Sequence, residues 1–166
     1  MDVMRGLDPD RPSSVKAVFQ SGTGNDGTWA LAAGLAALRE YRKLDGEGSY
    51  ATLHTRSQRL AQGLRNAFAR HGVPANVNQL GPMLQLFLTR APATFEGCAV
   101  SPTWPVMLFY LALINEGILL SLPTSNHIYL SFAHSDSDIE QILAKVETVL
   151  STYDFAALVD AAAAGA

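Results

Sequence analysis

The stretch MLQLFL at positions 83–88 decides the fold class, because it has the composition of a buried strand in a chain otherwise rich in helical patterns. All its residues but one are apolar, so at least one face is predicted to be buried. Residues 75–78 predict a second strand before it, and Gly81-Pro82 predicts the turn between the two. The two strands predict a small antiparallel or mixed sheet within an α/β domain.

Helical patterns flank these strands. Residues 29–41 are rich in Ala and Leu, and residues 50–71 repeat Leu and Phe near helical spacing. Residues 104–116 have a proline at the first turn, where a helix tolerates it. A last helix is predicted after Ser135, which forms a candidate capping box with Asp138.

The remaining segments are shorter. Residues 118–120 and 128–132 predict two more strands, and residues 90–103 a loop. The alanine-rich tail from residue 154 onward is expected to fray. The predicted order is therefore loop, helix, helix, strand, strand, helix, strand, strand, helix.

Composition excludes several classes of protein. The chain has 166 residues, of which 48% are hydrophobic and 16% charged, enough for a packed core. The net charge is -3 and the chain has no basic run, which argues against nucleic-acid binding. The longest apolar stretches, such as residues 106–114, are too short to cross a membrane. A single cysteine, Cys98, fits a reducing compartment, so we expect a soluble cytoplasmic protein.

A glycine-rich segment, Ser-Gly-Thr-Gly-Asn-Asp-Gly-Thr at residues 21–28, precedes the first helix. Backbone N–H groups and the helix dipole make such a place suitable for a phosphate group. The segment lacks the lysine of a P-loop and the preceding strand of a Rossmann motif. From the residues alone, a surface turn remains an open alternative.

An ordered set of motifs over residues 19–150 resembles class III aminotransferases. Gly22-Thr23 precedes an Ala-Ala-Gly helix at the family's spacing. Residues 72–89 are similar to the small-domain strands of the glutamate-1-semialdehyde aminomutase branch, and residues 117–134 to its C-terminal segment. The resemblance implies the C-terminal small domain of a fold type I pyridoxal-phosphate transferase. It divides the chain into a large-domain remnant (1–28), a connecting helix with the α/β domain (29–152) and a tail (153–166).

The resemblance also implies a cofactor and its contacts. In the family, pyridoxal phosphate forms a Schiff base with a lysine and stabilises a substrate carbanion. Thr23, with Gly22 and Ser21, is expected to bind the phosphate of the cofactor held by the other subunit. Asn126 is the expected substrate contact. Many members have an arginine for the substrate carboxylate where this chain has Ser131, which favours the aminomutase branch.

No catalytic residue is expected in this chain. The family's Schiff-base lysine lies upstream of the Gly-Thr pair, and neither Lys16, Lys43 nor Lys145 stands in that context. Lys43 and Lys145 are expected to be solvated surface charges. We therefore predict that these 166 residues alone are inactive.

The other candidate residues have structural interpretations. His54, His71 and His127 lack a metal-ligand spacing, so no metal site is expected. His134 is expected to make a structural hydrogen bond and Met83 to lie in the core. Trp29 and Trp104 are interpreted as core or interface anchors, and Cys98 as a loop or packing residue.

Three functions remain as alternatives. The first is a C-terminal fragment of an aminomutase or aminotransferase, and the second is a non-catalytic remnant that dimerises through residues 29–41. The third is a small ligand-binding α/β module of the amino-acid-sensing kind. Apolar surface on residues 29–38 favours self-association, so the expected partners are a second copy, a higher oligomer or a full-length paralogue.

Overall fold

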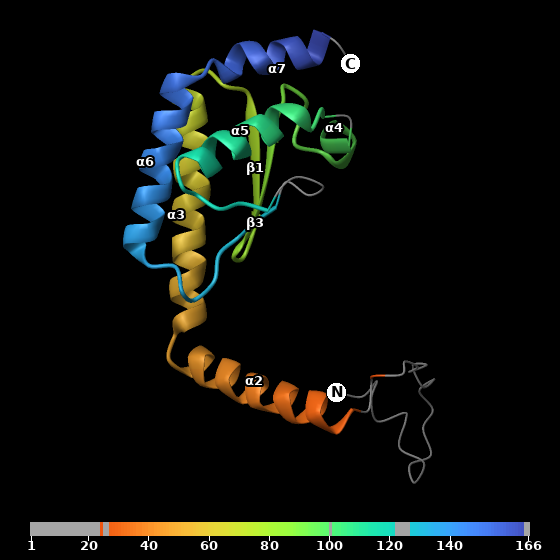
Figure 1. The fold of residues 1–166 in the computed structure, drawn as a ribbon, viewed down its shortest axis with the longest axis vertical. Coiled ribbons are helices and arrows are strands. Elements are labelled where there is room, and N and C mark those ends of the chain that lie inside the picture. The colour runs from red at the N-terminus through yellow and green to blue at the C-terminus, as the bar shows by residue number, and fades with distance from the viewer. Residues whose placement is uncertain (1–23, 25–26, 100, 122–126, 165–166) are drawn as a thin grey trace. The chain divides into compact units, whose positions relative to one another are not determined.

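The structure, a computed structural model, describes residues 24, 27–99, 101–121 and 127–164. These fall into two compact units, which meet in sequence between Leu44 and Asp45. The first unit holds most of helix α2 (Thr28–Gly46), and the second holds a sheet with its helices (Figure 1).

The second unit has the mixed α/β order that the sequence predicts. Its elements are α3 (Ser49–Arg70), β1 (Ala75–Leu80), β2 (Met83–Leu88), α4 (Phe95–Ala99), α5 (Trp104–Asn115), β3 (His127–Tyr129), α6 (Asp136–Thr152) and α7 (Phe155–Ala164).

The sheet is antiparallel throughout and has the strand order β1-β2-β3. Val77 pairs with Leu86, and both side chains are buried on the face that packs against the helices. Asn78 pairs with Gln85, and Gln85 in turn pairs with His127, on the other face. The prediction of a small antiparallel or mixed sheet is confirmed, with the antiparallel alternative realised.

The core lies between this sheet and helices α3, α5, α6 and α7. The predicted apolar face of α3 is confirmed, since Leu53, Leu60, Leu64 and Phe68 are all buried. Phe109 of α5 stands at the centre, with ring centroids 5.2 Å from Phe68 and 5.4 Å from Phe155. These rings therefore join three helices that are distant in sequence.

Two helices end in the same hydrogen-bond pattern, in which a glycine adopts a left-handed conformation. After α3, Gly72 has φ 66° and Val73 N–H donates to the Phe68 carbonyl at 2.9 Å. After α5, Gly117 has φ 84° and Ile118 N–H donates to the Leu113 carbonyl at 2.9 Å. Both are Schellman caps. The strand predicted at residues 118–120 is wrong, because the first of its amides already closes the helix end.

Two other segments are more ordered than predicted. The loop predicted at residues 90–103 contains the short helix α4. The tail expected to fray forms α7 and buries Phe155, Val159 and Ala162 against the core. Alanine supplied the helix propensity, but those three contacts, at helical spacing, hold the segment in place.

Individual side chains also correct the sequence predictions. Met83 is exposed, because it pairs with Leu80 and Tyr129 on the outer face of the sheet. Trp29 is 90% exposed, so it is not a core residue. Lys145 is half-buried and donates to the Glu116 carbonyl at the end of α5, whereas Lys43 is exposed as predicted, beside Glu40.

Candidate functional site

The residues predicted to bind the cofactor and the substrate, Ser21, Gly22, Thr23 and Asn126, lie outside the described residues, as does Lys16. The structure does describe the start of α2, which follows Thr23 closely in sequence, and the segment between β3 and α6, which contains Ser131 and His134.

Helix α2 begins at Thr28, directly after a turn. Gly27 N–H donates to the Gly24 carbonyl at 3.4 Å, and Leu31 N–H donates to the Gly27 carbonyl at 2.9 Å. Amides that precede the first such helical bond have no acceptor within their own helix. The first turn carries no acidic side chain, although Asp26 stands in sequence between that turn and the predicted phosphate contacts. The amides at the start of α2 therefore suit an anion held just upstream on the condition that this carboxylate is directed away from it.

The segment between β3 and α6 is fixed by hydrogen bonds within itself. His134 Nδ1 lies 3.1 Å from the Ser131 backbone nitrogen and 3.1 Å from the Ser131 hydroxyl. Since the backbone N–H can only donate, Nδ1 accepts, and the neutral ring carries its proton on Nε2. The predicted structural hydrogen bond of His134 is confirmed.

Helix α6 starts with the predicted capping box, which is confirmed. Asp138 N–H donates to Ser135 Oγ at 3.2 Å, and Ser135 N–H donates to an Asp138 carboxylate oxygen at 2.7 Å. The Ser135 hydroxyl also donates to that carboxylate at 2.7 Å, and this bond is the largest cause of the lowered pKa of Asp138. Both groups are therefore occupied in ending the turn and starting the helix.

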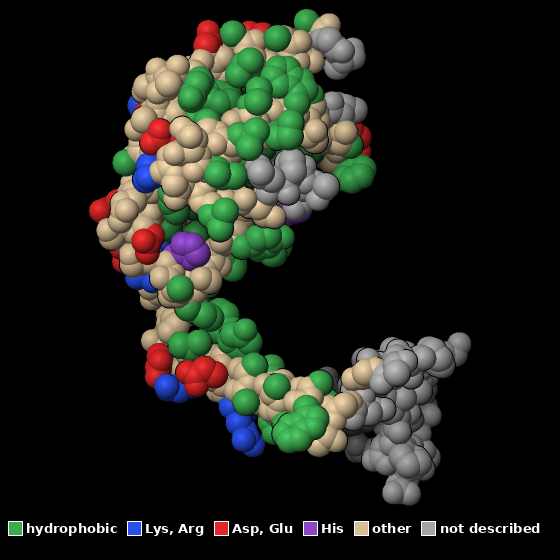
Figure 2. All heavy atoms as spheres, in the orientation of Figure 1, with side chains coloured by type: hydrophobic (Ala, Val, Ile, Leu, Met, Phe, Trp, Pro, Cys, Tyr) green, Lys and Arg blue, Asp and Glu red, His purple; other side chains and the backbone are tan. Residues whose placement is uncertain are grey.

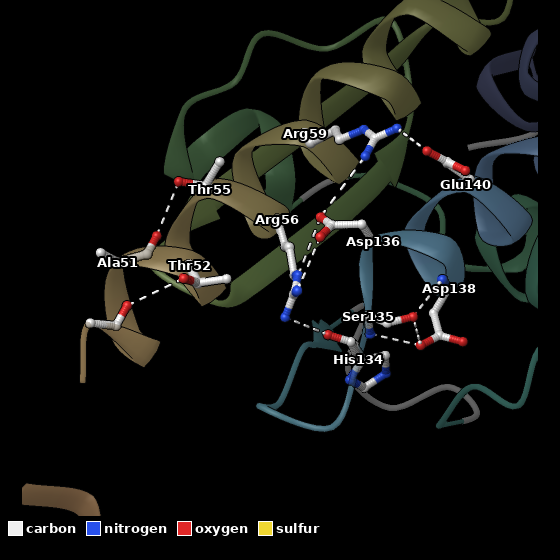
Figure 3. A network of polar contacts seen from close by, with 11 residues as sticks. Ala51, Thr52, Thr55, Arg56, Arg59, His134, Ser135, Asp136, Asp138 and Glu140 are labelled. Atoms are coloured by element: carbon white, nitrogen blue, oxygen red, sulfur yellow. Dashed lines mark hydrogen bonds and ion pairs between the residues drawn. The ribbon is translucent and has the colours of Figure 1, made fainter. Parts of the chain in front are cut away.

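Two arginines of α3 connect this segment to the rest of the second unit (Figure 3). Arg56 donates to both carboxylate oxygens of Asp136, at 3.0 and 3.3 Å, and to the His134 carbonyl at 3.0 Å. Arg59 donates to Glu140 at 2.7 Å. The hydrogen bond from Arg56 is the main cause of the lowered pKa of Asp136. These contacts cannot be predicted from local sequence patterns, because the partners lie about 80 residues away.

The hydrogen bonds of Arg56 and Arg59 hold the start of α6 against α3. Both guanidinium groups are engaged by carboxylates, and Ser131 offers a hydroxyl where many relatives in the implied family have an arginine. A cavity of about 210 Å³ adjoins the segment and is lined largely by apolar side chains, among them Leu64, Phe109 and Ile128. Such walls do not suit a doubly charged phosphate. Of the two parts considered, the start of α2 is therefore the one suited to a phosphate.

Comparison with solved structures identifies the fold. The β-phenylalanine aminotransferase from Variovorax paradoxus superposes on 91% of this chain with a TM-score of 0.70 and 24% identity, over 33% of its own length. The omega-transaminase from Sphaerobacter thermophilus superposes on 81% with a TM-score of 0.67 and 23% identity, over 30% of its length. A transaminase with pyridoxal phosphate bound superposes on 95% of this chain, with a TM-score of 0.65 and 20% identity. The chain thus has the fold of a C-terminal domain of pyridoxal-phosphate transaminases.

Comparison with curated proteins gives the family. Glutamate-1-semialdehyde 2,1-aminomutase from Desulfosudis oleivorans is 34% identical over 135 residues, which are 81% of this chain and 31% of the relative. Glutamate-1-semialdehyde 2,1-aminomutase 1 from Bacillus cereus is 31% identical over 151 residues, which are 90% of this chain and 33% of the relative. The chain belongs to the class III aminotransferase family, as its sequence motifs predict. It spans about a third of the length of these curated relatives. No family model matches.

Among the described residues, no helix has both the length and the apolar character needed to cross a membrane.

Proposed function

We propose that the chain is the C-terminal part of a pyridoxal-phosphate-dependent aminomutase or aminotransferase, similar to glutamate-1-semialdehyde aminomutase. One observation carries the proposal: 81–90% of this chain aligns with about a third of each aminomutase. Agreement in sequence and in fold over the same extent supports a shared role for this region.

Ser21, Gly22 and Thr23 are the proposed contacts to the cofactor phosphate, in a site completed by the other subunit. Pyridoxal phosphate, when bound there, supplies an electron sink for the substrate carbanion. This chain's residues would hold the phosphate through backbone amides and the Thr23 hydroxyl. The neutral first turn of α2, which follows directly, supports this assignment.

Trp29 provides a way to test phosphate binding, because it is exposed and lies six residues after Thr23. Titration with millimolar pyridoxal phosphate should quench its fluorescence saturably. Weak binding is expected, since these residues provide the phosphate contacts alone. Thr23→Val should weaken the apparent affinity by about threefold or more, equivalent to roughly 0.7 kcal/mol. Thr52→Val, at an exposed threonine of α3, should leave it unchanged. Equal affinities for wild type and Thr23→Val would refute the contact.

The substrate side is proposed to include Asn126 and to lack a carboxylate-binding arginine at position 131. The pairing of Arg56 with Asp136 supports this, because that guanidinium does not replace the missing arginine. A substrate bound there would meet the Ser131 hydroxyl, as the aminomutase branch favours.

These 166 residues alone are proposed to be inactive, because Lys16, Lys43 and Lys145 do not stand in the context of the Schiff-base lysine. Incubation with pyridoxal phosphate and borohydride, followed by peptide mass spectrometry, should find no stoichiometric adduct at a single lysine. A full-length relative provides the positive control. A stoichiometric adduct at Lys16 would overturn this part of the proposal.

The second candidate function is a non-catalytic chain that associates through α2, with a second copy, a higher oligomer or a full-length paralogue. The exposure of the large apolar side chains along that helix favours it (Figure 2). Saturable quenching of Trp29 by pyridoxal phosphate separates the two candidates, since a remnant that only associates shows none. Both candidate functions are proposed for a cytoplasmic protein. The single free cysteine, Cys98, supports that location.

A further inference from the structure

The cavity of about 210 Å³ lies within the second unit and is walled by three of its helices, by β3 and by residues 118–121. Its walls include Leu60 and Leu64 of α3, Phe109 and Leu113 of α5 and Val146 of α6, each at most 3% exposed. The cavity therefore borders the most deeply buried part of the core. Protein interiors contain few voids larger than a water molecule. A void of this size beside close-packed side chains therefore suits a ligand.

The chemistry of the walls limits what the cavity can hold. Among the described residues that line it, none is Asp, Glu, Lys or Arg, so a charged molecule would enter without a partner of opposite charge. A buried water molecule needs two to four polar partners, which walls made largely of leucine, isoleucine, valine and phenylalanine do not supply. Apolar cavities of roughly 150 Å³ remain dry and bind a molecule the size of benzene. The occupant that fits is therefore uncharged, largely apolar and about the size of one aromatic ring with a small substituent.

His134 provides a polar group at the edge of these apolar walls. It lines the cavity, and its Nδ1 accepts from the Ser131 N–H at 3.1 Å, so the neutral ring carries its proton on Nε2. Within the part of the chain that the structure describes, Nε2 makes no hydrogen bond. Arg56 fixes the backbone beside the ring by donating to the His134 carbonyl at 3.0 Å (Figure 3). One oxygen atom on the occupant would satisfy a donor held in this way.

We propose that this cavity binds an uncharged aromatic molecule with one oxygen atom, of which phenol is the simplest example. The ring lies among the leucines, and the oxygen accepts from His134 Nε2–H. A ligand of about seven non-hydrogen atoms is expected to bind with a dissociation constant of about 0.1–5 mM. No residue assigned to the cofactor phosphate takes part, so the inference goes beyond the proposed function and stands or falls without it.

Phenol, toluene and benzoate test the proposal, because they share a ring and differ in the oxygen and in the charge. Each is titrated into the whole chain at neutral pH, without pyridoxal phosphate, and binding is followed by NMR shifts of the backbone amides. Phenol and toluene should bind saturably and shift residues that line the cavity. Benzoate should show no saturation up to about 10 mM, because its carboxylate would be buried without a partner. Absence of binding by phenol, or equal binding by phenol and benzoate, overturns the proposal.

His134→Asn tests the hydrogen bond to the oxygen. The asparagine amide oxygen can replace Nδ1 as the acceptor for Ser131, but no donor then stands in the place of Nε2. The affinity for phenol should fall about threefold or more, whereas that for toluene should stay the same. Unchanged toluene binding also shows that the cavity persists in the variant. An unchanged affinity for phenol, or equal losses for both probes, contradicts the contact.

Ile142→Phe tests the location, because Ile142 lines the cavity from α6 and the larger ring fills part of it. Binding of phenol and toluene should weaken tenfold or more. Leu158→Phe adds similar bulk at a half-buried leucine of α7 outside the cavity and should leave both affinities unchanged. Thermal unfolding shows that each variant is folded, and the comparison of phenol with toluene in His134→Asn does not depend on Ile142→Phe. Wild-type affinities in a folded Ile142→Phe variant would place the ligand elsewhere and overturn the proposal.

Discussion

Helices α2 and α3 follow each other in the chain but have opposite surroundings. Helix α3 buries seven of its 22 residues, among them Leu60, Ser57 and Phe68. Helix α2 has a higher share of apolar residues, yet every residue except half-buried Leu44 is exposed. The difference shows that apolar content predicts a helix and its tendency to pack. It does not predict which other segments of the molecule bury the apolar face of that helix. For α3 that cover is the sheet and α6, which follow it in sequence.

The largest expected effect separates the leucines of the two helices. Leu60→Ala should lower the free energy of unfolding of the second unit by about 2–5 kcal/mol, because it leaves a cavity in the core. Leu35→Ala should change it by less than about 0.5 kcal/mol. Urea unfolding of both variants, followed by circular dichroism at a concentration where the chain is monomeric, measures the contrast. A loss above about 2 kcal/mol for Leu35→Ala would show that α2 is covered by its own chain.

The glycines of the two helices offer the next contrast. A methyl group at Gly63 would lie 2.5 Å from Leu143 of α6. Gly63→Ala should therefore destabilise the second unit by about 1–3 kcal/mol, despite the gain in helix propensity. Gly34→Ala, in open space, should raise the helicity of the dilute chain. If Gly63→Ala proves neutral in urea unfolding, α3 and α6 can separate enough to admit the methyl group.

The start of α6 contrasts with that of α3. The N-cap of α3 is Gly48, which has no side chain to donate or accept a capping hydrogen bond. Ser135→Ala removes the capping hydroxyl and should cost about 1 kcal/mol. Because the pKa of Asp138 is lowered in the folded state, its stabilisation is present above its ordinary value of 3.8 and is lost as pH falls through the folded pKa. The cost of Ser135→Ala, measured by urea unfolding, should therefore shrink below about pH 4. A difference between the two proteins that does not vary with pH would contradict this coupling.

The smallest effect concerns two tyrosines. Tyr110 of α5 is fully buried, its hydroxyl has no hydrogen-bond partner among the described residues, and burial raises its pKa. Tyr110→Phe should leave the melting temperature unchanged or raise stability by up to about 1 kcal/mol. Tyr50→Phe, at an exposed ring that packs edge-on against Phe132, should have no measurable effect. A clear loss for Tyr110→Phe would mean that its hydroxyl is hydrogen-bonded in solution.

Sequence patterns were sufficient where the structure depends on near neighbours. The helices around Leu60 and Phe109 and the capping box at Ser135 involve residues within one or two turns of each other. The ion pair of Arg56 with Asp136 escaped prediction, because it joins positions 80 apart. The strand predicted at residues 118–120 failed because alternating apolar residues do not reveal that the Ile118 amide completes a helix cap.

For the candidate site too, some features were predicted from neighbouring residues and others depended on the fold. The motif around Gly22-Thr23 and the Ala-Ala-Gly helix predicted the family from sequence alone, which the aminomutase relatives confirm. The contacts of Ser21, Gly22, Thr23 and Asn126 stay predictions. The structural hydrogen bond of His134 was predicted, but its partner needed the fold, since a turn brings Ser131 to the ring.

By itself the sequence determined helices α2, α3, α5 and α6, the hairpin, the family and the apolar character of α2, because local periodicity and ordered motifs lie in neighbouring residues. Tertiary structure alone decided which apolar faces are covered, which arginines are neutralised and that the C-terminal tail docks. Those outcomes depend on contacts between segments far apart in the chain, and their energies arise only when the segments meet.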